Sequence, residues 1–183
     1  MFTEDELEHL REHLSHYPER RAGAIYCLYA VQDKIGYIDD KGIMIVTELT
    51  GLSKTQLEEL ITFFTLLRRR PVGRNVLRIC DSISCHVMGS RQVLEAAEAH
   101  TGVALGEISR TGSVTILPSI CLGLCNHAPA ALLNDEDEVS RLTPESVQKL
   151  LDELDQQPFQ QSATGSQVIA TSGHSMLTEG RDH

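Results

Sequence analysis

Residues 75–100 read "NVLRICDSISCHVMGSRQVLEAAEAH" and combine two different periodicities. The first six residues form a short apolar run, which predicts a buried β-strand that ends at Cys80. Residues 90–100 instead repeat apolar side chains at helical intervals, and Gly102 follows as a stop signal. The stretch therefore predicts a strand, a loop that carries two cysteines, and a helix.

The same order, a strand followed by a cysteine pair, recurs farther along the chain. The segment "SVTILPS" at residues 113–119 predicts a second strand and runs toward "CLGLC" at residues 121–125. A third strand is expected in "PAALLND" at residues 129–135, a fourth around Val139, and a final helix from Pro144. This alternation predicts an α/β domain in the second half of the chain.

The first 72 residues carry helical patterns instead. Thr3 and Glu6 have capping-box spacing, and leucines follow at helical intervals until Pro18 interrupts them. Two further apolar stripes with helical spacing are each closed by a glycine, Gly36 and Gly51. Three helices are therefore expected before residue 52.

A fourth helix is expected to begin at Ser53, whose spacing from Gln56 again fits a capping box. We expect it to end at the arginines 68–70, because cations suit a helix C-terminus and Pro71 blocks continuation. The predicted fold class is α+β, with three parts: a helical bundle over 1–72, an α/β domain over 73–155, and a Ser-, Thr-, Gln- and Gly-rich tail over 156–183 that is disordered or wraps a partner.

Charge and hydropathy exclude several classes of protein. With 26 acidic and 16 basic residues the net charge is −10, so no nucleic-acid partner is expected. The acidic start "MFTEDELEHL" does not resemble a signal peptide, so the cysteines are expected to stay reduced. The longest apolar stretch, "AGAIYCLYAV", covers only half of the roughly 20 residues that a membrane span needs. No direct membrane insertion is expected.

Four of the five cysteines form two pairs, C-x4-C and C-x3-C, each directly after a predicted strand. Four thiolates from two loops favour zinc or an iron-sulfur cluster over harder cations. A [2Fe-2S] cluster takes two cysteines per iron, and a four-residue spacing is known in such sites, whereas zinc favours shorter knuckles. Ser82, Ser84 and Gly123 suit loops that turn donors toward a negative cluster. Zinc stays open as the alternative.

Two histidines lie beside the pairs, His86 after Cys85 and His127 near Cys125. Mixed Cys/His ligation is possible chemistry, but a hydrogen bond from outside the ligand set is the commoner role. Cys27 lies on a helical stripe and is expected to be a core residue.

These residues carry a resemblance to a known family. The runs "TFFTLLRRRPVG", "PVGRNVLRICDSISCHVMGS", "LPSICLGLCNHAPA" and "LTPESV" resemble the E subunit of bacterial NADH:quinone oxidoreductase, respiratory complex I, over about residues 17–155. This family belongs to the thioredoxin-like [2Fe-2S] ferredoxins. The chain departs from its pattern at Phe63–Phe64 and at Asn126 and His127, which bears on partner contacts and on the cluster potential.

The resemblance implies a thioredoxin-like ferredoxin domain after the helical bundle. It implies one [2Fe-2S] cluster on four ligands: Cys80, Cys85, Cys121 and Cys125. It also implies a partner flavoprotein that binds FMN and NADH and performs the hydride chemistry, together with other peripheral-arm subunits. The chain would be a subunit of a quinone-reducing translocase, cytoplasmic and peripheral to the inner membrane, with no activity of its own.

Three alternatives remain at this point. The motifs also fit the equivalent subunit of an NAD-dependent formate dehydrogenase or an NAD-reducing hydrogenase. The four cysteines fit a zinc-stabilised interaction module. The stretch "IVTELTGLSKTQLEELITFF" at residues 45–64, with the arginines 68–70, fits a helix-turn-helix DNA-binding regulator, although the acidic charge opposes that function.

Overall fold

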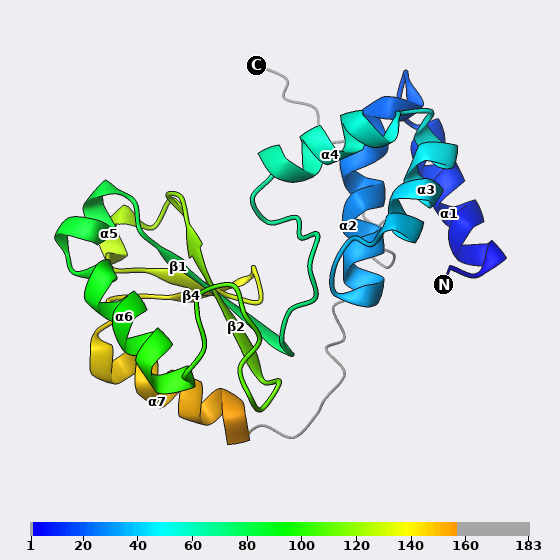
Figure 1. Cartoon of the computed structure of the whole chain (residues 1–183). Helices are drawn as coiled ribbons and strands as arrows, with labels where there is room; N and C mark the ends of the chain where they lie inside the picture. The colour runs from blue at the N-terminus through cyan, green and yellow to red at the C-terminus, as the bar shows by residue number, and fades with distance from the viewer. Residues whose placement is uncertain (1, 157–183) are drawn as a thin grey trace, which may run out of the picture. The chain divides into compact units, whose positions relative to one another are not determined.

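The computed structural model describes residues 2–156, and this part of the chain divides into two compact units, residues 2–63 and residues 64–156 (Figure 1). The first unit is helical and the second combines a sheet with helices. The predicted α+β class is confirmed. The domain boundary expected after residue 72, as a division between independently folding parts, stays a prediction. All but the first residue of the predicted tail, residues 157–183, lies outside the described residues.

Two capping boxes predicted from the sequence stand at the start of the first and the last helix of the helical unit. Its elements are α1 (Glu4–Ser15), the 3-10 turn η1 (Arg20–Gly23), α2 (Ala24–Ile35), α3 (Asp40–Thr50) and α4 (Lys54–Phe63). The Thr3 hydroxyl accepts a bond from the Glu6 N–H, and the Glu6 carboxylate accepts one from the Thr3 N–H at 2.6 Å. Ser53 and Gln56 make the same reciprocal pair before α4. Both capping boxes are confirmed.

The fourth helix is shorter than expected: α4 ends at Phe63, so its predicted extension to the arginines 68–70 is wrong. The chain that follows makes contacts to the sheet that a continued helix would not offer. The Leu66 carbonyl accepts a bond from Arg78 Nη2 at 3.1 Å, and Arg68 forms an ion pair with Asp135 at 3.1 Å. We call residues 64–73 the strap.

The second unit contains one four-stranded sheet with strand order β2-β1-β3-β4. Its strands are β1 (Asn75–Cys80), β2 (Val114–Ser119), β3 (Ala131–Leu133) and β4 (Asp137–Val139). β1 and β2 are parallel, whereas β3 runs antiparallel to both β1 and β4. The parallel pair is joined by α5 (Ile83–Val87) and α6 (Ser90–Thr101), and α7 (Pro144–Gln156) closes the unit.

The two faces of the sheet are covered differently. α6 and α7 lie side by side on one face, where they share an apolar core with Leu77 and Ile79 of β1 (Figure 1). Because side chains alternate along a strand, Arg78 points to the other face, toward the strap. The Gly73 N–H donates to Thr115 Oγ1 at 2.8 Å, and a Cβ on Gly73 would lie 2.7 Å from the Val114 backbone. The strap therefore needs glycine at this close approach.

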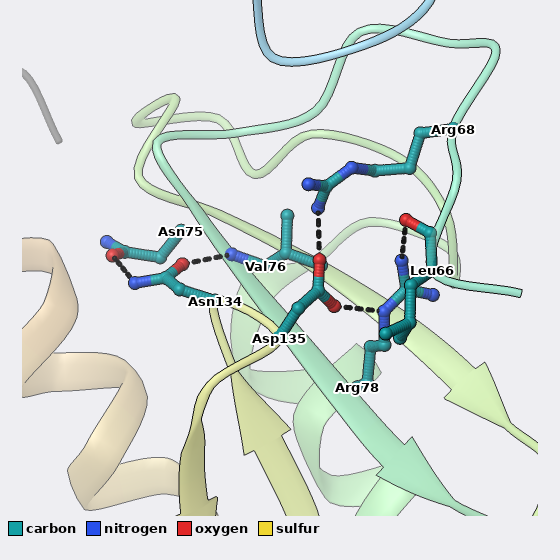
Figure 2. A network of polar contacts seen from close by, with 7 residues as sticks. All are labelled: Leu66, Arg68, Asn75, Val76, Arg78, Asn134 and Asp135. Atoms are coloured by element: carbon teal, nitrogen blue, oxygen red, sulfur yellow. Dashed lines mark hydrogen bonds and ion pairs between the residues drawn. The ribbon is translucent and has the colours of Figure 1, made fainter. Parts of the chain in front are cut away.

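A buried polar network joins the strap, β1 and the β3–β4 turn (Figure 2). Asp135 accepts from Arg78 Nε on one oxygen and pairs with Arg68 on the other, and Arg78 is only 4% exposed. Asn134 and Asp135 both have positive φ, 55° and 64°, as a tight hairpin turn of the I′ type requires. Asn134 Oδ1 accepts from the Val76 N–H at 3.0 Å. β1 is therefore bonded to the strap and the β3–β4 turn through Arg78, and again to the turn through the Val76 N–H.

Candidate metal centre

The parallel pairing of β1 and β2 brings the two cysteine pairs together. Cys80 is the last residue of β1 and lies in register with Ser119, the last residue of β2. Cys121 follows only two residues later. Since parallel strands end at the same edge of a sheet, both cysteine loops leave the sheet side by side.

The first pair is buried, and its loop contains a helical turn. Cys80 is 3% exposed and Cys85 is 2% exposed. Cys85 lies within α5, where the sequence predicted a loop. Burial, above all, raises the pKa of Cys85, although the Ala130 N–H donates to its sulfur and acts in the opposite direction. A cation that binds thiolates would reverse the effect of this burial.

Asp81 fixes the ends of this first loop. Its Oδ1 accepts from His86 Nδ1 at 3.1 Å and from Ser90 Oγ at 2.8 Å. These two bonds, first the one from His86, lower the pKa of Asp81. Asp81 directly follows Cys80, and His86 directly follows Cys85. The bond between Asp81 and His86 therefore fixes the backbone next to both candidate ligands.

The second pair is exposed and is organised by its own backbone. Cys121 Sγ and Cys125 Sγ are 3.5 Å apart, and the Gly123 N–H donates to Cys121 Sγ at 3.4 Å. Gly123 has a φ of 83°, which favours glycine. The Gly123 bond, followed by the contact with Cys125, lowers the pKa of Cys121, whereas the bond to Cys121 raises the pKa of Cys125. The Ser84 hydroxyl, from the first loop, acts to lower the pKa of Cys125.

Apolar side chains from the second loop pack against the first pair. Cys80, Cys85 and Ala130 form a small buried cluster, and Leu122, Leu124 and Ala128 lie against it. The first cysteine pair is therefore shielded from water, while the second pair is exposed. Such partial burial is one of the factors that set the potential of an iron-sulfur cluster.

The residues present fit a [2Fe-2S] cluster. Two thiolates at about 2.3 Å from one tetrahedral metal lie about 3.8 Å apart, close to the observed separation of Cys121 and Cys125. Among residues 2–156, no three His, Cys, Asp or Glu side chains are arranged to hold a single metal ion, so the fit rests on the spacing within the pair and on the chemistry of the thiols. Two buried polar atoms beside the loops, Ser119 Oγ and His127 Nδ1, have no hydrogen-bond partner in the described structure. These atoms suit a group with unfilled acceptor or donor sites.

Three other residues named from the sequence are placed as follows. His86 faces Asp81, and His127 lies in the 3-10 turn η2 (Cys125–His127) with its Nδ1 buried. Cys27 is fully buried in α2 of the helical unit, where burial raises its pKa to about 12. A thiol with that pKa is inert at neutral pH, as expected of a core residue.

Four contributors to the site were not predicted from the sequence: Asp81, Ser90, Ser119 and Ala130. The position of Asp81 between Cys80 and the first loop was a visible signal, because short polar side chains there commonly bond to nearby groups. Ser119 and Ala130 become recognisable only once β1 is known to pair with β2 and β3, respectively. That pairing is a tertiary fact.

Comparison with known proteins agrees with this geometry. The family model described as thioredoxin-like [2Fe-2S] ferredoxin matches residues 10–155, and the chain belongs to this family. Within it, the chain is 35% identical over 150 residues to the E subunit of NADH-quinone oxidoreductase from Buchnera aphidicola, covering 82% of this chain and 92% of the Buchnera protein. The corresponding protein of Pseudomonas aeruginosa is 34% identical over 152 residues, with 83% and 91% covered. The resemblance to this subunit is confirmed.

A solved structure shares the fold at lower identity. A chain of an NAD+-reducing [NiFe]-hydrogenase in the H2-reduced state matches with a TM-score of 0.61 and 20% identity. The match covers 72% of this chain but only 22% of the hydrogenase chain. It therefore supports the thioredoxin-like fold and leaves function to the residues of the site.

Proposed function

We propose that this chain is the electron-transfer subunit of an NADH:quinone oxidoreductase and carries one [2Fe-2S] cluster on Cys80, Cys85, Cys121 and Cys125. The observation that carries the proposal is the parallel pairing of β1 and β2 up to Cys80 and Ser119, which starts both cysteine loops at the same edge of the sheet. Family membership and the relatives from Buchnera and Pseudomonas support it. They favour this function over the formate dehydrogenase, hydrogenase and zinc alternatives.

The chain's own residues bind the cluster and adjust its electrostatics. A [2Fe-2S] cluster supplies reversible one-electron chemistry. The four thiolates would hold it, and Leu122 and Leu124 would shield it from water. The Gly123 N–H donates to Cys121 Sγ, and the Ala130 backbone and the Ser84 hydroxyl act to lower the pKa values of Cys85 and Cys125. Donors of this kind offset the negative charge of the thiolates and favour the reduced state.

The first experiment asks which metal the protein holds. Protein purified without oxygen is expected to contain iron and acid-labile sulfide in equal amounts and to give a paramagnetic signal after reduction by dithionite. One zinc per chain in a colourless protein would establish the interaction module instead.

Four large apolar side chains surround the cysteine loops and are exposed: Ile83 by 83%, Val87 by 78%, Ile120 by 67% and Met88 by 61%. Exposed apolar residues that gather around a functional group commonly mark a protein interface. We infer that a flavoprotein subunit with FMN and NADH covers this face and performs the hydride chemistry. Electron transfer needs such proximity, and the isolated chain would turn over no substrate.

In this assembly the chain would sit among other peripheral-arm subunits, in the cytoplasm and against the inner membrane through the complex. None of the helices in residues 2–156 is long and apolar enough to cross a bilayer. Arg68, a phosphate contact under the DNA-binding alternative, is engaged with Asp135.

Co-expression with the flavoprotein subunit of the same organism tests the interface. Ile83→Asp is expected to reduce co-purification at least tenfold, because a carboxylate would be buried without a partner. Ile83→Leu is the matched control and should bind as the native chain does. Equal recovery of both variants would remove this face from the interface, and recovery with hydrogenase or formate dehydrogenase subunits would change the parent complex.

A further inference from the structure

The hydroxyl of Ser119 is the feature of the site that remains unexplained. Its Oγ is buried and has no hydrogen-bond partner within the described residues. Leaving a buried hydroxyl unsatisfied costs about 1–3 kcal/mol, so native proteins rarely retain one without a function. Serine also has no advantage of strand propensity over valine at the end of a strand. The hydroxyl therefore requires an acceptor.

The position of Ser119 identifies that acceptor. Ser119 is in register with Cys80 on the neighbouring parallel strand, so the two side chains leave the sheet on the same face. The backbone holds this arrangement, because the Asp81 N–H donates to the Ser119 carbonyl at 3.0 Å. Cys121 follows two residues after Ser119. Ser119 therefore lies beside Cys80 of the first pair and two residues before the second pair.

We propose that Ser119 Oγ–H donates a hydrogen bond to a sulfur of the bound cluster and makes its reduction potential more positive. This inference rests on the proposed function, since it requires the cluster. Thiolate and sulfide sulfurs carry no hydrogen and can only accept hydrogen bonds, so serine is the donor. No proton is transferred, and Ser119 stays neutral in both redox states.

The effect on potential follows from charge. Adding one electron makes the cluster more negative, so a donor stabilises the reduced form more than the oxidised form. Hydrogen bonds to charged groups are about twice as strong as those between neutral groups. We expect removal of the hydroxyl to lower the ratio of reduced to oxidised protein about fivefold at a fixed potential, which is a shift of about 40 mV to more negative values.

Four forms of the full chain separate the hydroxyl from its size. Ser119→Ala removes the hydroxyl, whereas Ser119→Thr and Ser119→Val have nearly the same shape and differ in hydroxyl against methyl. Redox titration followed by the visible spectrum is expected to give two groups of reduction potentials. The potentials of the serine and threonine forms should be more positive than those of the alanine and valine forms. Equal potentials for threonine and valine would overturn the proposal, as would a native potential in Ser119→Ala.

A spectroscopic measurement guards against variants that fail to assemble. The reduced native protein, exchanged into D2O, should show a deuterium coupling to the cluster that is present in Ser119→Thr and absent in Ser119→Ala or Ser119→Val. Absence of any such difference would overturn the proposal and assign the hydroxyl to a water molecule instead. The native spectrum tests the proposed function separately. A native protein without iron would show no cluster spectrum and would refute the proposed function before any variant is compared.

Discussion

The two cysteine loops differ in what holds them. The first is buried, starts within the central strand and is fixed by Asp81, which accepts bonds from His86 and Ser90. The second is exposed and depends on one backbone N–H, that of Gly123, and on a short 3-10 turn. One half of the site is therefore part of the core of the unit, and the other half is a surface turn.

This difference separates two tasks of the site. A buried, rigid half sets the position of the metal and the dielectric around it, while an exposed half leaves a short path for an electron to a partner. The exposed apolar residues around the loops support the same division. Substitutions in the two loops are therefore expected to differ in kind as well as in size.

The largest expected effect comes from the ligands. Cys80→Ser and Cys85→Ser should abolish the visible iron-sulfur spectrum, because a serine oxygen is a poor ligand in a buried apolar site. Cys121→Ser and Cys125→Ser should retain at most a minor fraction of the iron, since solvent can reach the weakened half. Iron and sulfide analysis with visible circular dichroism measures both.

Cys27→Ser is the control for these substitutions. Cys27 is buried in the helical unit, and its replacement should leave the spectrum unchanged. An unchanged spectrum in Cys121→Ser would remove that residue from the ligand set. Equal losses in all four ligand variants would show that the two halves contribute alike, against the comparison above.

The next effect concerns the support of the buried loop. Asp135→Asn removes the charge that Arg78 and Arg68 share and leaves Arg78, 4% exposed, with the Leu66 carbonyl but without an ionic partner. Such a loss costs about 3–5 kcal/mol, and β1 with the first loop should be destabilised as a result. Urea unfolding followed by the visible spectrum of the cluster measures the change in this unit alone.

Asp137→Asn is the matched control, because Asp137 is exposed in the same hairpin. It should unfold at the native urea concentration. A similar midpoint for Asp135→Asn and Asp137→Asn would show that the network does not support the cluster.

Much of the second unit could be predicted from sequence because its signals are local. The strand before Cys80, the helix after Gly89 and the helix start at Pro144 were each visible in periodicity and capping residues. The cysteine frame located the site for the same reason, since both pairs follow strands directly. The division of the fold between helices and sheet was therefore predictable.

The contacts that are not local could not be predicted. The arginines 68–70 looked like a helix end, yet the acceptor that draws Arg68 away from a helix, Asp135, lies far along the chain. The turn in α5 was missed because five residues are too few to show helical periodicity. Ser119 carries no signal of its own until its register with Cys80 is known.

A smaller effect is expected from Asp81→Ala, which releases His86 and Ser90 from the first loop. Because Ser90 is fully buried, its hydroxyl would lose its acceptor, and we expect a cost of about 1–2 kcal/mol in the unfolding free energy. The iron should also be lost faster to a chelator. Ser82→Ala is the control, since the Ser82 side chain makes no capping bond before α5.

The difference in unfolding free energy between the native chain and Asp81→Ala should depend on pH in a defined direction. The pKa of Asp81 is lowered by its two donors, so its contribution is complete above the ordinary aspartate pKa of about 4 and is lost as the pH falls through the lower folded value. The stability gap between the native chain and Asp81→Ala should therefore not shrink between pH 7 and pH 5.5. A gap that closes in this range would assign the stabilisation to a different group.

The smallest effect is expected at Gly123 in the second loop, where a comparison with Gly112 distinguishes backbone strain from the hydrogen bond to Cys121. Gly123 and Gly112 have φ values of 83° and 72°, and neither has an atom within 4 Å of an added Cβ. Alanine at either position should cost about 1 kcal/mol, through the backbone alone. Of these two glycines, only Gly123 donates its N–H to a cysteine sulfur, and backbone strain in the Gly123→Ala variant would displace that N–H. Gly123→Ala alone should therefore also shift the visible spectrum and the reduction potential. If Gly112→Ala changed the spectrum equally, the spectral change would arise from the loss of stability and not from the Gly123 hydrogen bond, and the exposed loop would not depend on that bond.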